Sequence, residues 1–338
     1  MSTNHFCSNH GVLPFGCGAA LLLLCMASSL LAGAVQASDQ APLRGRIALT
    51  FDDAPRADSA MLSGTERSRR LIEGLRESGV EGALFFVITQ GLEAHPERAQ
   101  RLRDYVGAGH FLANHSHSHA WLSRSTVEDY LADIDQARRR LAEFESVLPF
   151  YRFPFLDEGR DQMRRDALCA GLAERGLKNG YVTIDNYDWY LDALANRAQA
   201  AGKQLDHTAL RKLYVEMLID AVEFYDRIAQ RYLSRSPDHV LLLHENDIAA
   251  LFIGDLVRAL RERGWQIISA DEAYRDAIAE QIPDTLFNGQ GRVAALAHQQ
   301  GATKSDLVHP LEDEAALDLA FARAVIVIEP ATESAASP

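Results

Sequence analysis

Cysteine is scarce in this chain of 338 residues, and its scarcity excludes a fold that depends on disulfide bonds. Only four cysteines are present, and three of them, Cys7, Cys17 and Cys25, lie close to the N-terminus. If that segment is removed, Cys169 has no partner for an internal bridge. With 47% hydrophobic residues the composition is otherwise that of a globular protein, so the fold must rest on a hydrophobic core.

Positive charge is also in short supply. The chain has 34 Lys and Arg against 47 Asp and Glu, which gives a net charge of -13. Binding to a phosphate backbone needs clustered positive charge, so this balance argues against nucleic acid as a partner. The basic run at residues 138–140 lies among helix-forming residues and is predicted to be the solvated face of a helix.

Charged residues are absent from positions 1–37. Residues 19–31 are densely apolar, and small residues end the segment in the pattern that a signal peptidase recognises. We therefore expect a signal peptide at 1–37 that is cleaved after Ala37, a secreted or periplasmic protein, and no stable membrane span after cleavage. Because no Lys or Arg precedes the apolar segment, an uncleaved anchor is the alternative.

The chain also lacks a Gly-x-Ser-x-Gly motif, and Cys169 lies in a helical stretch rather than at the end of a strand. Both observations argue against a serine or cysteine hydrolase.

Apolar runs typical of buried strands instead alternate with amphipathic helical stretches. The expected strands are, in order, 47–51, 83–88, 110–113, 150–153, 181–184, 240–243 and 265–268. The expected helices are 65–78, 96–106, 127–144, 166–175, 207–232 and 256–263. About seven strand-helix units predict a parallel α/β barrel in preference to an open sheet.

The alternation predicts the domain organisation. We expect a short linker at 38–46 and the barrel at 47–282. Beyond residue 283 only two helical stretches remain, 291–300 and 313–324, and the chain ends in a Pro, Ser and Ala tail that is expected to be disordered. This helical C-terminal extension is expected to pack against the barrel rather than to form a domain of its own.

Two adjacent carboxylates, Asp52 and Asp53, end the first expected strand. Two neighbouring acids are costly to bury unless a cation or strong hydrogen-bond donors compensate them, and a metal ion at Asp53 would do so. A solvated strand edge is the alternative. Other polar side chains follow later strands, namely His115, Arg152, Asp185 and His244. Catalytic residues of such barrels gather at the C-terminal ends of the strands, so we expect these residues to form one site.

Three histidines occur within five residues, at His115, His117 and His119. His115 and His119 would share one face of a helical turn, whereas His115 and His117 would pair on an extended strand. Either pair together with Asp53 forms the set of two histidines and one carboxylate that is common in catalytic zinc sites. A polar, exposed loop without a metal is the alternative.

Five short motifs follow one another along the chain. They are Thr50-Phe51-Asp52-Asp53, Asn114-His115-Ser116-His117-Ser118-His119, Arg152-Phe153-Pro154-Phe155, Asp185-Asn186-Tyr187-Asp188-Trp189 and Leu242-Leu243-His244. In this order they are highly specific, and by them the sequence resembles the polysaccharide deacetylases, the family-four carbohydrate esterases with a chitin deacetylase-like catalytic domain.

The resemblance implies a distorted (β/α) barrel and the metal-dependent removal of N- or O-acetyl groups from sugars. By matching position, Asp53, His115 and His119 would hold the metal, which would be zinc or another divalent ion such as cobalt or nickel.

The resemblance also implies the roles of the neighbouring residues. Asp52 would be the general base and His244 the general acid. Arg152 would orient the base, and Asp185 would steady Arg152 or His244. In the pocket, Phe155 would offer its backbone N–H to the oxyanion, and Trp189 with Leu242 would line the acetate site.

Three features depart from the family pattern. Ala54 stands where the family usually has glycine, His117 is an extra histidine that could compete as a ligand, and the stretch between Asp188 and the later strands is long. The predicted function is removal of acetyl groups from an N-acetylated glycan such as chitin-like oligomers, poly-N-acetylglucosamine or peptidoglycan. The alternatives are a xylan-type O-acetyl esterase, a small-amide hydrolase, and a catalytically silent glycan-binding protein on the same barrel.

Overall fold

The structure is a computed structural model that describes residues 43–327. The expected signal peptide and the expected C-terminal tail lie outside the described residues. Within the described part, no helix is both long and apolar enough to span a membrane.

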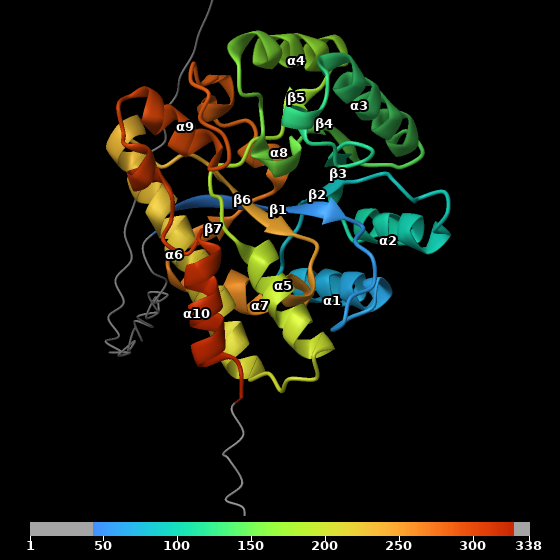
Figure 1. Cartoon of the computed structure of the whole chain (residues 1–338), viewed down its shortest axis with the longest axis vertical. Coiled ribbons are helices and arrows are strands. Elements are labelled where there is room, and N and C mark those ends of the chain that lie inside the picture. Colours follow the sequence, from blue (N-terminus) through green and yellow to red (C-terminus); the bar gives the residue numbers. More distant parts are fainter. Residues whose placement is uncertain (1–42, 328–338) are drawn as a thin grey trace, which may run out of the picture. The chain divides into compact units, whose positions relative to one another are not determined.

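Seven parallel strands form one sheet, which confirms the predicted strand number and direction. Their order is β5-β4-β3-β2-β1-β6, and β7 also pairs with β1. The central strand β1 is largely buried and lies amid β2, β6 and β7 (Figure 1). The strand bounds are β1 Gly45–Ala54, β2 Leu84–Val87, β3 Phe111–Asn114, β4 Val147–Tyr151, β5 Lys178–Asn179, β6 His239–His244 and β7 Trp265–Ile267.

An irregular segment, residues 178–184, links the two edges of the sheet. At its start β5 pairs with β4, and at its end the backbone N–H of Thr183 donates to Val240 of β6 at 3.0 Å. The sheet therefore curls into a distorted barrel, as predicted. The expected strand at 181–184 is largely wrong, because the regular pairing occurs earlier. At Gly180 the backbone passes close to the ring of Phe86, with which a side chain at this position would collide.

Ten α-helices cover the sheet in the described part of the chain. Their bounds are α1 Gly64–Glu77, α2 Pro96–Gly107, α3 Val127–Leu141, α4 Gln162–Glu174, α5 Asp188–Ala200, α6 His207–Leu233, α7 Asp247–Glu262, α8 Ala270–Ala273, α9 Gly291–Gln299 and α10 Glu314–Ala324. Helix α7 begins well before its expected start at residue 256. Its first turn buries Asp247, Ile248, Ala249 and Ala250, so this turn lacks the exposed polar residues that mark the start of a surface helix.

The helical C-terminal extension is part of the same hydrophobic core as the barrel. Helix α9 packs against α6, and α10 packs against α5 and α6. Val293 of α9 and Leu317 and Phe321 of α10 are buried in one cluster with Ile47 and Leu49 of β1. The extension therefore shares the core that supports the strand ends.

Candidate active site

The register of the parallel strands brings four of the sequence motifs to one edge of the sheet. Asp52 of β1 lies opposite His244 of β6. On its other side β1 pairs with β2, and Val87 of β2 lies opposite Asn114, which directly precedes His115. This edge is the C-terminal end of the strands, where the strand-end residues were expected to meet.

Asp53, His115 and His119 form a compact group of ligand atoms, which all lie within 4.8 Å of one another. Oδ1 of Asp53 is 3.5 Å from Nε2 of His115 and 3.4 Å from Nε2 of His119. This oxygen is buried and accepts no hydrogen bond within the described structure. Burial alone would raise the pKa of Asp53, but the neighbouring histidines, His115 foremost, hold the pKa well below its usual range.

Both imidazoles present Nε2 to Asp53. Nδ1 of His115 donates to the carbonyl oxygen of Arg152 at 2.9 Å, which leaves Nε2 as the ring nitrogen on the side of Asp53. Burial, helped by His115, lowers the pKa of His119 to about 4, so this ring is neutral at pH 7. One carboxylate and two imidazole nitrogens around an unsatisfied buried oxygen fit a divalent cation such as zinc.

His115 and His119 come together through a loop, residues 115–119, and neither the helical turn nor the extended strand that were considered for the histidines is present there. Ser116 and His119 have φ values of 74° and 57°, so the loop twice adopts a left-handed conformation. The side chain of Ser116 accepts a hydrogen bond from the backbone N–H of His119 at 2.8 Å. A carboxylate oxygen of Asp133 on α3 accepts one from the backbone N–H of His117 at 2.7 Å. These bonds, rather than helical periodicity, bring residues 115 and 119 together.

The extra histidine, His117, points away from this group. Its Nδ1 lies 2.9 Å from the hydroxyl of Thr89, and its Nε2 lies 2.9 Å from the side-chain amide of Gln136. Both ring nitrogens are therefore occupied by protein partners. His117 ties the loop to its surroundings, and His119 is the histidine that joins His115.

Asp52 is buried and bound to Arg152. Nη1 of Arg152 donates to Oδ1 of Asp52 at 2.8 Å. The rest of the guanidinium donates to the hydroxyl oxygens of Thr50, at 3.2 Å, and Tyr274, at 3.0 Å, and to the carbonyl of Gly180. Burial disfavours this cation, but the carboxylate of Asp52 and the hydroxyl of Tyr274 raise the pKa of Arg152. Arg152 is thus held rigidly against Asp52; Tyr274 had no signal in the sequence beyond its place after the last strand.

His244 is held by Asp188, a residue that the sequence reasoning missed. Nδ1 of His244 donates to Oδ1 of Asp188 at 2.7 Å, and the backbone N–H of His244 donates to Oδ2 at 2.9 Å. Although burial lowers the pKa of His244, the fully buried carboxylate of Asp188 raises it to about 9. His244 is therefore charged at pH 7, and its Nε2 carries a proton.

Asp185 does not have the place expected for it. In the described part of the chain it makes no hydrogen bond or ion pair with Arg152 or His244. It is buried and lines the same cavity as His244, and burial raises its pKa to about 7. Asp185 and Asp188 lie three positions apart in one short stretch, so the sequence offered two acids and could not show which one faces the imidazole.

A cavity of about 440 Å³ opens over these groups. Its lining includes the three expected pocket residues, Phe155, Trp189 and Leu242. Trp189 is 37% exposed, which places it on the rim rather than in the core, whereas Leu242 is buried. The same lining contains two residues of the C-terminal extension, Gly289 and Gln290, for which the sequence gave no signal.

Phe155 adopts an unusual backbone conformation beside the histidines. Its φ is 60°, and that of the next residue, Leu156, is 49°. Its ring packs against His119 with the centroids 4.7 Å apart and against Trp121 at 4.8 Å. Non-glycine residues with a left-handed backbone are uncommon, and those that exist are concentrated at functional sites.

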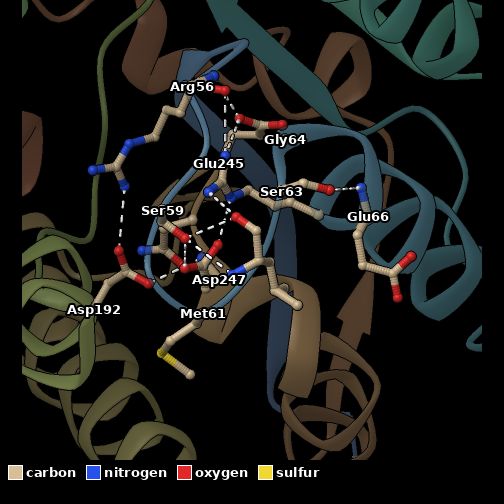
Figure 2. A network of polar contacts seen from close by, with 12 residues as sticks. Arg56, Ser59, Met61, Ser63, Gly64, Glu66, Asp192, Glu245 and Asp247 are labelled. Atoms are coloured by element: carbon tan, nitrogen blue, oxygen red, sulfur yellow. Dashed lines mark hydrogen bonds and ion pairs between the residues drawn. The ribbon is translucent and has the colours of Figure 1, made fainter. Parts of the chain in front are cut away.

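A buried polar network fixes the loop that follows the two carboxylates (Figure 2). Glu245, directly after His244, accepts hydrogen bonds from the backbone N–H of Arg56 at 2.7 Å and from the guanidinium of Arg101 at 2.7 Å. Asp247 accepts one from Nε of Arg67 at 2.7 Å. Ala54, at the start of the loop, is buried without a positive φ, so alanine is compatible with this turn.

Comparison with known proteins gives a family match over part of the chain. Residues 39–174 match the model of the polysaccharide deacetylase family. The peptidoglycan-N-acetylglucosamine deacetylase of Bacillus cereus is 24% identical over 147 residues, which cover 43% of this chain and 47% of the relative. The chain therefore matches about half the length of that relative.

Solved structures of this family resemble the chain at low identity. A family 4 carbohydrate esterase from Streptomyces lividans, in complex with acetate, is 20% identical, covers 68% of this chain and is itself covered to 96%, with a TM-score of 0.45. A pseudoenzyme from Bacillus anthracis is 14% identical, covers 69% of this chain and is itself covered to 66%, with a TM-score of 0.48.

The first two motifs of the sequence, which supply Asp52, Asp53, His115 and His119, fall inside the matched segment, as does Arg152. The part of the chain that holds the candidate metal ligands is therefore similar to the polysaccharide deacetylase family.

Proposed function

We propose that this protein is a metal-dependent hydrolase that removes acetyl groups from N-acetylated glycans. The observation that carries the proposal is the convergence of a ligand group, a base clamped by arginine and a charged histidine on one cavity. We also propose that it acts outside the cytoplasm after loss of residues 1–37, on the evidence of the apolar segment at 19–31.

A divalent cation held by Asp53, His115 and His119 would supply Lewis acidity, which polarises an acetyl carbonyl and acidifies water. Asp52 takes the role of general base. Its Oδ1 is bound to Arg152, while its Oδ2 lies on the side of the ligand group, 3.7 Å from Nε2 of His115. The hydrogen bond from Arg152 fixes the orientation of the Asp52 carboxylate, which can accept the proton of the attacking water.

His244 takes the role of general acid. Asp188 binds Nδ1, so Nε2 is the atom that can deliver a proton to the leaving nitrogen. An amine leaving group needs that proton, and a pKa of about 9 keeps it available at neutral pH. The Asp188–His244 pair therefore supports amide cleavage by an acid that is charged before the substrate arrives.

The cavity can hold an acetyl group and the sugar that bears it. Leu242 supplies an apolar wall, and the half-exposed Trp189 offers an aromatic face on which a sugar ring can stack. The left-handed backbone at Phe155 turns this residue toward His119, and its N–H is the proposed donor to the developing oxyanion.

The test is acetate release from N-acetylglucosamine oligomers, peptidoglycan and acetylated xylan, with added zinc and with chelator, using the chain from residue 38. We expect chelator-sensitive release from an N-acetylated glycan. Asp52→Asn should lower the rate by about 10²- to 10⁴-fold while metal content stays at the wild-type value, because only the base is removed. Asp306→Asn, a change of the same kind at an exposed position outside the cavity lining, is the matched control and should keep both metal and activity.

Release from acetylated xylan alone would point to the O-acetyl esterase. No acetate from any substrate, with metal still bound, would contradict the proposal and favour a small-amide hydrolase or a silent glycan-binding protein. An Asp52→Asn variant with an unchanged rate would remove Asp52 from the mechanism.

A further inference from the structure

A second cavity, of about 380 Å³, lies beside the catalytic one and shares Asp53 and Arg56 with it. Its far wall is formed by the loop after β2, which includes Gly91, and by His95 and Arg98 at the start of α2. The two cavities are thus neighbours on either side of the metal-ligand carboxylate. A glycan whose acetyl group lies in the first cavity can place a neighbouring sugar in the second.

The titratable residues that line the second cavity, apart from Asp53, are all basic. They are Arg56, His95 and Arg98. This is notable in a chain with a net charge of -13, because most of the surface repels anions. The metal ligand Asp53 would be neutralised by its cation, so the cavity offers positive charge next to the reaction centre.

Of the three basic residues that line the second cavity, Arg98 is the one that has no ion pair within the described residues. It is half-buried, and Gly91 lies beside its guanidinium: a Cβ added to Gly91 would be 3.4 Å from Nη1 of Arg98. Across residues 43–327, no carboxylate forms an ion pair with Arg98. His95 differs, because its ring is exposed and lies 3.3 Å from the carboxylate of Glu97.

Arg56, in contrast, is already paired. Its guanidinium reaches across to Asp192 of α5 at 3.6 Å (Figure 2). Asp192 also accepts the backbone N–H groups of Asp247 at 2.9 Å and Ile248 at 3.2 Å. Arg56 is therefore held in place between the two cavities, with about a third of its side chain exposed. Among the basic residues of the cavity, Arg98 is therefore the one that remains to bind an anionic group of a ligand.

We propose that the second cavity binds the carboxylate of a sugar adjacent to the one that loses its acetyl group. The substrate would then be an acidic glycan in which N-acetylated and carboxylated sugars are neighbours. This inference rests on the proposed deacetylase function and names its substrate class. Arg98 binds the carboxylate through its planar fork, and Arg56 adds a second donor on the side of the reaction centre.

Two sources of the carboxylate can be compared with a neutral reference. Peptide-free peptidoglycan oligosaccharides carry a lactyl carboxylate, hyaluronan oligosaccharides carry a uronic acid, and chitotetraose carries no charge. We expect kcat/KM of the wild-type protein to be about tenfold higher, or more, for at least one acidic oligosaccharide than for chitotetraose. The difference should shrink as the salt concentration rises.

Arg98→Gln should lower kcat/KM for that acidic oligosaccharide by about tenfold and change chitotetraose by less than about twofold. Arg103→Gln, on the exposed side of the same helix, is the matched control and should change neither. Calorimetric titration of the Asp52→Asn variant with the same oligosaccharides, with and without Arg98→Gln, measures the binding without turnover.

Equal kcat/KM for acidic and neutral substrates, or an equal loss on both in Arg98→Gln, would overturn the inference and leave the deacetylase proposal intact. The inference would also be overturned if the only effect of Arg98→Gln were weaker inhibition by the product acetate. If no oligosaccharide releases acetate, the deacetylase proposal fails. Calorimetry still shows whether the second cavity binds a carboxylated sugar. Tighter binding of the acidic oligosaccharide that depends on Arg98 would support the inference, and its absence would overturn it.

Discussion

At the scale of single residues, the pairing of His244 with Asp188 determines which protonation state the site presents. A buried imidazole alone would be neutral, because burial disfavours its charged form. Asp188 reverses this effect through a 2.7 Å hydrogen bond and its negative charge. The acid form of His244 should therefore persist from neutral pH up to about 9 and disappear as the pH rises through that value.

Asp188→Asn should shift the alkaline limb of the pH profile of kcat/KM to lower pH by about one unit or more, because the amide removes the charge that raises the pKa of His244. The profile should be measured between pH 6 and 10 at saturating zinc. Asp185→Asn is the matched control: it removes a nearby acid that is not bound to His244, so the limb should move much less. A limb that stays in place in Asp188→Asn would show that His244 is not the titrating acid.

The residue-level predictions from the sequence succeeded or failed for identifiable reasons. Asp53, His115 and His119 could be grouped because strand ends converge in a parallel barrel, and the structure brings them within 4.8 Å. Which of the two acids, Asp185 or Asp188, binds His244 depends on which of them points toward the end of β6. Side-chain direction in an irregular segment leaves no periodic signal in the sequence.

At the scale of elements, the histidine loop at 115–119 depends on helix α3 for its shape. Asp133 accepts two backbone N–H bonds from the loop, from His117 at 2.7 Å and from Ser118 at 3.2 Å, and one from the Ser118 hydroxyl at 2.7 Å. The loop has two left-handed residues, so it needs outside support to keep this conformation. Asp133 thus orients the ligands without touching the metal position.

Asp133→Ala should weaken zinc binding by about 10- to 100-fold, because ligands without outer support lose orientation. Equilibrium dialysis against zinc measures the affinity. Glu128→Gln, an exposed change on the same helix, should leave the affinity as it is. Wild-type zinc affinity in Asp133→Ala would mean that the loop holds its shape without α3.

Most strands and helices could be predicted because their apolar runs are short, buried and bounded by turn residues. Helix α5, at Asp188–Ala200, was missed even though it carries Asp188 and Trp189. Its buried face contains the acids Asp188 and Asp192 beside Leu191 and Ala195, so it lacks a clear apolar stripe. The closure of the barrel at 178–184 could not be predicted either, because this segment makes few regular backbone hydrogen bonds to the neighbouring strands.

At the scale of the whole molecule, the C-terminal extension contributes to the hydrophobic core rather than lying on its surface. Side chains from residues 291–324 are buried in the main cluster, namely Val293, Leu296, Leu307, Leu317 and Phe321. The hydroxyl of Tyr225 on α6 also donates to Glu312 at 2.8 Å. Full burial of one such apolar side chain stabilises a fold by about 1.5–3 kcal/mol. Five of them represent about as much free energy as the whole net stability of a typical domain.

A chain truncated after residue 282 should therefore fail to fold, although the sequence rhythm places the end of the barrel there. The loss would expose the faces of α5 and α6 that α9 and α10 cover, and it would remove Gly289 and Gln290 from the cavity. Circular dichroism and thermal unfolding of the truncated chain measure this. A chain that ends at residue 327 keeps every one of these contacts and provides the reference unfolding temperature. Cooperative unfolding of the shorter chain near that temperature would show instead that the barrel core is complete without the extension, and that the two helices only bind to its surface.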